Sequence, residues 1–207
     1  PLWNKEQSFN QENYVMSTLM VQATYLCCKG AKGSQACSSN EINDLISKFG
    51  ITNINQVISQ YNILFNKRSS PKSLFATIGL VEGTDLGVIS WRGTSDTDDW
   101  IADASPGLRE SLFKTCSNVL LGQCDLKIPM GFDNNSGMHS AMLQIYNNSF
   151  VSNNDKIYTL YGAITNLYPS NTKWIISGHS LGAALAELCT ADLSSKGVKI
   201  NSSYLFA

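Results

Sequence analysis

The chain contains little histidine, little proline and little charge. Of its 207 residues only 2 are histidine and 5 are proline, and charged side chains make up 15%. The formal net charge is −1 and no basic run is present, so no surface is expected that could neutralise nucleic-acid phosphates. No apolar stretch reaches the roughly 18 residues that a membrane-spanning helix needs, which excludes a transmembrane segment. Without clustered histidines or a Cys-x-x-Cys pair, neither a metal site nor a cofactor is expected.

Apolar residues, in contrast, are plentiful. They make up 43% of the chain, and 207 residues suffice for one domain with a sizeable core, or for most of one. The elements that periodicity and turn residues predict are a helix over 13–28, a short helix over 41–49, a hairpin of strands 74–81 and 86–91, an irregular stretch over 104–135, a mainly helical segment over 138–168 with a break at 147–155, and strands over 172–177 and from residue 204 onward.

The 6 cysteines bear on the cellular compartment. Two spacings suit local disulfides of a secreted protein: Cys116 with Cys124, and Cys27 or Cys28 with Cys37. Metal binding and free thiols are the competing interpretations, and Cys189 is expected to be a small buried apolar residue. Asn-x-Ser sequons, which would permit glycosylation, occur at Asn134, Asn147 and Asn201. The chain begins at Pro1, which predicts a processed leader or a trimmed start. We therefore expect a protein that is secreted or lies within the secretory or lysosomal pathway.

The most informative motif is the pentapeptide Gly-His-Ser-Leu-Gly at residues 178–182. An apolar run that includes Trp174 precedes it, and a helical pattern follows from Leu181. Strand, sharp turn and helix in this order are the context in which Gly-x-Ser-x-Gly forms a nucleophile elbow. Ser180 is therefore the predicted catalytic nucleophile. The alternative, a Gly/Ser turn without chemistry, is less favoured because the flanking elements fit.

Sterics explain why these residue types are needed. A serine at the tip of so tight a turn has strained backbone angles, and Gly178 and Gly182 leave room for the strand and the helix to approach each other. The helix that begins near Leu181 directs its free N–H groups and the positive end of its dipole toward the serine, where an oxyanion would form during acyl transfer. The elbow thus predicts a nucleophile and an anion stabiliser side by side.

A second motif lies upstream, where a β-prone run ends in Arg92-Gly93-Thr94, followed by an acidic and aromatic stretch. Together with the pentapeptide and the run that starts at Gly137, this order resembles the class 3, or fungal-type, triacylglycerol lipase family of the α/β-hydrolase superfamily. The resemblance covers nearly the whole chain. It implies an α/β fold with a central, mostly parallel sheet flanked by helices. It also implies a serine ester hydrolase that acts on lipid esters at a lipid–water interface, without a metal or a cofactor.

The resemblance also implies roles for individual residues. Thr94 corresponds to the oxyanion-hole residue, with the backbone N–H of Leu181 as the second donor. Residues 95–106 correspond to a mobile lid, with Trp100 on its apolar side; the alternative is a solvated acidic loop. Trp100 and His179 are the predicted substrate-binding residues, although the sharp turn is expected to place the His179 ring beneath the elbow, away from Ser180 Oγ. His139 is not expected to be the catalytic base.

The missing parts are equally informative. In this family the catalytic acid and histidine follow the serine, but here no histidine follows Ser180, and Asp192, within the next helix, is the only later aspartate. We therefore expect residues 1–207 to be one lipase-type α/β-hydrolase domain, incomplete at its carboxy terminus. The catalytic His and Asp are expected beyond Ala207, and the 207 residues alone should be close to inactive because a serine without a base is a weak nucleophile.

Three functional alternatives stay open. The first is a secreted carboxylic-ester hydrolase, foremost a triacylglycerol lipase with a Ser-His-Asp mechanism. The second lies within the same enzyme class and is a phospholipase A1 or a feruloyl-type esterase. The third is a non-catalytic lipid-binding relative that retained the elbow and lost the base.

Overall fold

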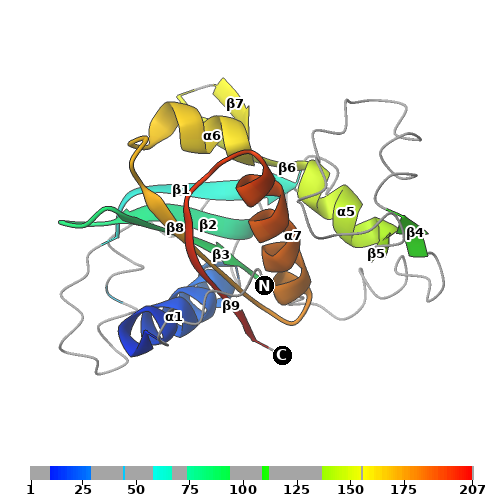
Figure 1. Cartoon of the computed structure of the whole chain (residues 1–207), viewed down its shortest axis with the longest axis horizontal. Helices are drawn as coiled ribbons and strands as arrows, with labels where there is room; N and C mark the ends of the chain where they lie inside the picture. The colour runs from blue at the N-terminus through cyan, green and yellow to red at the C-terminus, as the bar shows by residue number, and fades with distance from the viewer. Residues whose placement is uncertain are drawn as a thin grey trace, which may run out of the picture.

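The computed structural model describes residues 10–28, 44, 58–66, 74–93, 109–111, 137–154 and 156–206. A seven-stranded sheet with the strand order β7-β6-β1-β2-β3-β8-β9 forms its centre, and helices lie on both faces (Figure 1). The elements are α1 (Gln11–Cys28), β1 (Ile58–Asn66), β2 (Leu74–Val81), β3 (Leu86–Trp91), β4 (Arg109–Ser111), β5 (Gly137–His139), α5 (Ser140–Asn147), β6 (Ser149–Asn153), β7 (Lys156–Thr159), α6 (Leu160–Leu167), β8 (Lys173–His179), α7 (Leu181–Ser195) and β9 (Ile200–Phe206). Strands β4 and β5 form a separate two-stranded sheet.

The hairpin of β2 and β3 has the bounds that the sequence predicts. Its turn contains Gly83 at a φ of 74°, a conformation that glycine adopts without strain. The turn is closed by Thr84, whose backbone N–H and hydroxyl both donate to the carbonyl oxygen of Val81, at 3.2 and 2.8 Å. Local turn chemistry therefore fixes the register in which Ile78 pairs with Ile89.

Parallel pairing is concentrated next to the pentapeptide. Strand β8 pairs in parallel with β3 on one side and with β9 on the other, whereas β6, β1 and β2 pair with their neighbours in antiparallel fashion. A central sheet flanked by helices is as expected, but in the described residues the parallel strands occupy only this part of the sheet. Helix α7 provides the crossover from β8 to β9, whereas short turns join β2 to β3 and β6 to β7, and a short turn permits only antiparallel pairing.

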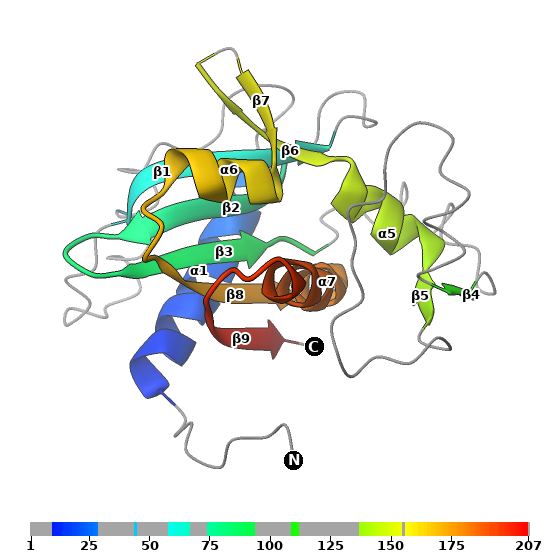
Figure 2. The same cartoon turned by 45° about the horizontal axis from the view of Figure 1, so that its top comes forward.

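The two faces of the sheet bury different helices (Figure 2). Successive strand residues point to opposite faces, so Val88 and Ile175 pack against Met16, Met20 and Ala23 of α1, while Ile89 and Ile176 belong to the cluster that contains α5, α6 and α7. All four of these strand side chains are fully buried. Burial of each contributes about 1.5–3 kcal/mol, and it holds β3 and β8, the strands that lead to the pentapeptide, firmly between two helical layers.

The segment 138–168 differs in part from expectation. Helices α5 and α6 are present, but the predicted break between them is a hairpin of β6 and β7, which turns at Asn154 with a φ of 47°. Phe150 and Val151 are buried because β6 pairs with β1, a long-range contact that helical spacing does not reveal.

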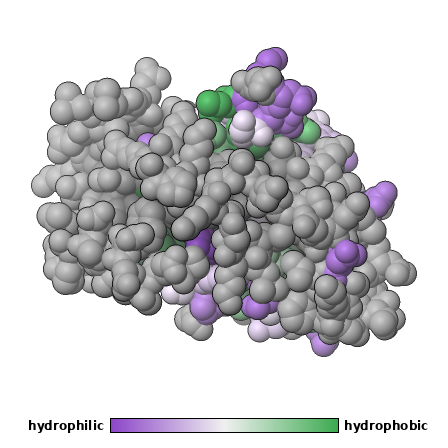
Figure 3. All heavy atoms as spheres, turned by 180° about the vertical axis from the view of Figure 1, so that it is seen from behind, coloured by the Kyte–Doolittle hydropathy of each residue, from purple (hydrophilic) through white to green (hydrophobic). Residues whose placement is uncertain are grey.

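In Figure 3 hydrophobic and hydrophilic side chains adjoin at the top of the molecule, the region that holds β7 and α6 in Figure 1. Ile157 of β7 is 58% exposed there.

Several sequence predictions fall on positions that the structure does not describe. The short helix over 41–49 is described only at Asp44, which is helical, and the stretch 104–135 only at β4. Cys37, Cys116 and Cys124 also lie outside the described residues, so the disulfides stay predictions. Cys189 is described, and its thiol is free and fully buried in the core, as expected. Among the described helices none is long and apolar enough to cross a membrane.

Candidate active site at the turn between β8 and α7

Ser180 occupies the sharp turn that the pentapeptide predicts, between the end of β8 and the start of α7. Its φ and ψ are 55° and −125°, a combination that costs a residue with a side chain about 1–3 kcal/mol. Two backbone hydrogen bonds hold this conformation. The Ser180 N–H donates to the carbonyl oxygen of Phe206 in β9, and the Ser180 carbonyl oxygen accepts from Ala183, both at 2.9 Å.

Gly178 and Gly182 permit the close approach that the turn requires. A Cβ added at Gly178 would overlap the carbonyl group of Gly182, and it would lie 2.9 Å from the Ala183 nitrogen. A Cβ added at Gly182 would overlap the carbonyl oxygen of Trp91 and would lie 2.7 Å from that of Arg92. The first glycine therefore lets α7 pack against β8, and the second lets α7 pack against the end of β3.

The start of α7 is suited to an anion. Ser180 is the N-cap residue, yet its side chain makes no capping hydrogen bond, and no acidic residue lies in the first turn. Ser180 is exposed to solvent. Leu181 is the first helical residue, so its N–H is one of the first four N–H groups of α7, which have no acceptor within the helix. This N–H also lies at the positive end of the helix dipole.

The end of β3 meets this turn. Trp91, Arg92 and Gly93 are buried, and the contact of Gly182 with the Trp91 and Arg92 carbonyls places the end of the strand beside the first turn of α7. Thr94 and Trp100 lie outside the described residues, as does the whole of the predicted lid at 95–106. The oxyanion role of Thr94 and the substrate-binding role of Trp100 accordingly stay predictions.

His179 is half-buried and is bound from the side of α1. Its Nδ1 lies 2.9 Å from the hydroxyl of Tyr25, and the two rings meet edge to face at 5.8 Å. Sequence reasoning missed Tyr25, because 154 residues separate it from His179 and no motif marks it. The hydrogen bond agrees with a ring that points away from the serine hydroxyl, while the substrate-binding role of His179 stays a prediction.

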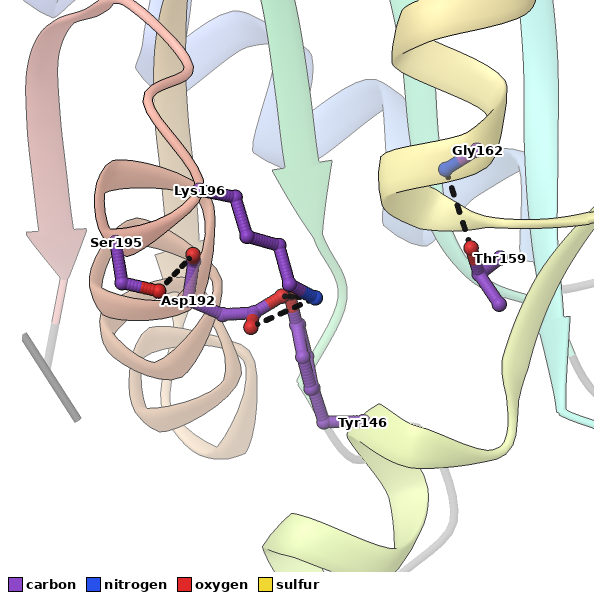
Figure 4. Close-up of polar contacts among 6 residues, drawn as sticks. All are labelled: Tyr146, Thr159, Gly162, Asp192, Ser195 and Lys196. Atoms are coloured by element: carbon purple, nitrogen blue, oxygen red, sulfur yellow. Dashed lines mark hydrogen bonds and ion pairs between the residues drawn. The ribbon is translucent and has the colours of Figure 1, made fainter. Parts of the chain in front are cut away.

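Asp192 is held in a buried polar cluster (Figure 4). Its Oδ2 accepts a hydrogen bond of 2.8 Å from the Tyr146 hydroxyl of α5, and Lys196 Nζ lies 3.0 Å from Oδ1. Burial, reinforced by Cys189 and Asp192, raises the pKa of Tyr146 well above its ordinary value. At the ~1.5 Å rise per residue of a helix, Asp192 lies about 18 Å along α7 from Ser180. It therefore joins α5 to α7 and is too distant to orient a catalytic base.

The remaining histidine is His139, the last residue of β5, directly before α5. The position of its side chain is not described, and we assign it no role. Within the described ranges, no cluster of three or more His, Cys, Asp or Glu side chains could hold a metal ion.

Comparison with known proteins identifies the class. Residues 88–206 match the family described as Lipase (class 3), a span that begins in β3 and includes the pentapeptide and β9. Since this match covers more than half of the chain, the protein belongs to the class 3 lipase family. A comparison with curated proteins yields no match.

Among solved structures the chain is similar to two forms of a lipase from Rhizomucor miehei in complex with its propeptide. A deletion mutant is 19% identical with a TM-score of 0.51, and the match covers 96% of this chain and 52% of that chain. The native complex is 18% identical with a TM-score of 0.49 over the same shares. At this level of sequence identity the similarity shows only that the folds are alike, and this conclusion rests on the first of the two structures. The chain spans about half the length of these lipase structures.

Proposed function

We propose that this protein is a serine carboxylic-ester hydrolase of lipase type, with Ser180 as its nucleophile. The observation that carries the proposal is the backbone of Ser180, a solvent-exposed residue that is held at a φ of 55° at the amino end of α7. Strain of this kind persists only where the surroundings enforce it, and it is concentrated at functional sites. Membership of the class 3 lipase family supports the same chemistry.

The proposed reaction is acyl transfer in two steps. Ser180 Oγ attacks the ester carbonyl carbon while a histidine removes the hydroxyl proton, and the N–H groups of Leu181 and Thr94 stabilise the tetrahedral oxyanion. The oxyanion collapses with expulsion of the alcohol, which takes the proton from the histidine. Water, deprotonated by the same histidine, then attacks the carbonyl carbon of the acyl-serine. The bond to Ser180 Oγ breaks, Oγ takes the proton back from the histidine, and the fatty acid is released.

Neither histidine of this chain is proposed as the base. Nδ1 of His179 is engaged by Tyr25, and consecutive side chains around a sharp elbow project to opposite sides. We propose that a histidine and an aspartate from outside these 207 residues complete the site. The proposed substrate is a lipid ester such as an acylglycerol, reached at a lipid–water interface after the segment 95–106 moves aside. A phospholipid or a feruloyl ester is the alternative substrate, and passage through the secretory pathway is part of the same proposal.

A fluorophosphonate probe tests the proposal, because it phosphonylates only an activated serine. The natural-length polypeptide, its Ser180→Ala variant and the 207-residue chain are exposed to the probe, and adducts are mapped by peptide mass. We expect a Ser180 adduct in the natural-length wild type alone. If no form is labelled at Ser180, the enzyme proposal is wrong, and a lipid-binding protein without catalysis is the better description.

A further inference from the structure

The hydroxyl of Tyr25 lies where three segments of the chain meet. Tyr25 belongs to the last part of α1, and its hydroxyl lies 2.9 Å from Nδ1 of His179, the residue directly before Ser180. The same hydroxyl contacts Gly93 so closely that a Cβ at this position would overlap it. That Cβ would also lie 2.6 Å from the carbonyl oxygen of His179. One side chain of α1 thus contacts both the elbow and the residue that precedes Thr94.

The helix that carries Tyr25 is well anchored. Met20 and Ala23 are fully buried against the sheet, in the cluster that contains Val88 and Ile175. Thr24, the neighbour of Tyr25, is itself buried, and its hydroxyl lies 2.9 Å from that of Thr77 in β2. Because these contacts fix α1 on the sheet, the position of the Tyr25 hydroxyl is set by the fold and does not depend on the substrate.

We propose that Tyr25 is a positioning residue of the active site. Its hydroxyl holds the His179 ring, and by contact with Gly93 it sets the spacing between the nucleophile elbow and the strand end that leads to Thr94. When the hydroxyl donates, Nδ1 is the acceptor and the proton of neutral His179 resides on Nε2. Tyr25 does not touch the reacting atoms. Its effect on catalysis passes through His179 and Gly93, and the inference rests on the function proposed above.

The test compares Tyr25→Phe with Tyr14→Phe in the natural-length polypeptide. Both substitutions remove only a hydroxyl from α1, but Tyr14 lies near the start of the helix, is 40% exposed and packs its ring against Tyr204 and Phe206. We expect Tyr25→Phe to lower both the rate of Ser180 labelling by the fluorophosphonate and kcat on a short-chain nitrophenyl ester about tenfold. KM should change less than about twofold, and Tyr14→Phe should match the wild type.

A second comparison shows whether the effect passes through His179. If it does, Tyr25→Phe should slow labelling less in the His179→Ala background than in the wild type, because the effects of coupled residues are not additive. Thermal unfolding of each variant confirms that it is folded. Equal labelling of folded Tyr25→Phe and wild type would overturn the positioning role while leaving the proposed function intact. Absence of Ser180 labelling in the wild type would contradict the function itself, and the positioning role with it.

Discussion

Gly178 illustrates how a single missing Cβ decides whether the turn can form. An alanine there would overlap the carbonyl group of Gly182, and the Gly178 backbone is held in place because β8 is paired on both sides. We expect Gly178→Ala to lower the free energy of unfolding by about 2–4 kcal/mol and to abolish labelling of Ser180. Urea unfolding and fluorophosphonate labelling provide the two measurements.

Gly197→Ala is the matched control for this substitution. Gly197 has a φ of 79°, but a Cβ there would meet nothing within 4 Å. Its replacement should destabilise by only about 1 kcal/mol, through the unfavourable backbone angle, and should leave labelling unchanged. Equal effects of the two alanines on labelling would show that the close approach at Gly178 is not what forms the elbow.

The Tyr146 hydroxyl supports the buried carboxylate of Asp192. Tyr146→Phe removes this donor and leaves Oδ2 of Asp192 with Lys196 as its remaining partner. We expect the free energy of unfolding to fall by about 1.5–3 kcal/mol, as for the loss of other hydrogen bonds to charged groups. Tyr161→Phe is the control, because it also removes a tyrosine hydroxyl near Lys196 but keeps the aromatic ring, whose centre lies 5.3 Å from Lys196 Nζ. A loss below 0.5 kcal/mol for Tyr146→Phe, on the same order as a surface substitution, would contradict this account.

The sequence predicts the elements that depend on local contacts better than those that depend on distant partners. The β2-β3 hairpin was predictable because its register depends on a local turn at Gly83, and the strand before Ser180 because an apolar run leads directly into the pentapeptide. Strands β1 and β6 were not predicted, because their partners lie far along the chain: Phe65 pairs with Phe150. The same reason applies to the site. Ser180 and its glycines form one local motif, whereas the contact of Tyr25 with His179 depends on how α1 packs.

The attachment of α1 to the sheet can be tested through its buried threonine pair. The hydroxyls of Thr24 and Thr77 lie 2.9 Å apart, and Thr24 also donates to the Met20 carbonyl oxygen at 2.7 Å. Replacing either threonine with valine preserves shape but leaves a buried hydroxyl with one partner fewer, which should cost about 1–3 kcal/mol in urea unfolding. The double valine variant should be destabilised by less than the sum of the two single variants. Full additivity would mean that the two hydroxyls do not stabilise each other.

For the whole molecule, stability should depend on pH through Cys189. Burial raises the pKa of this thiol well above its ordinary value of 9.0. Above about pH 9 the thiol of the unfolded chain loses its proton while that of the folded chain keeps it, so the unfolded state is favoured as the pH rises. The free energy of unfolding should therefore fall above about pH 9, by up to about 1.4 kcal/mol per pH unit from this one group.

Cys189→Ala isolates this contribution, because the other titrating groups remain. The variant should be less stable at neutral pH, since it leaves a cavity in the core, but its stability should fall less steeply above pH 9. Urea unfolding between pH 7 and 10 under reducing conditions measures both slopes. Parallel curves for the wild type and the variant would show that the thiol ionises equally in both states.

The hydrogen bond from Ser180 to Phe206 also imposes an order on biosynthesis. The ribosome synthesises the chain from its amino end, so the residues of β8 and α7 leave the exit tunnel before the carbonyl group of Phe206 does. Until then the serine N–H lacks the partner that it has in the folded protein. The strained conformation of Ser180 is therefore completed only after translation has passed β9, and the nucleophile acquires its final geometry later than the elements on either side of it.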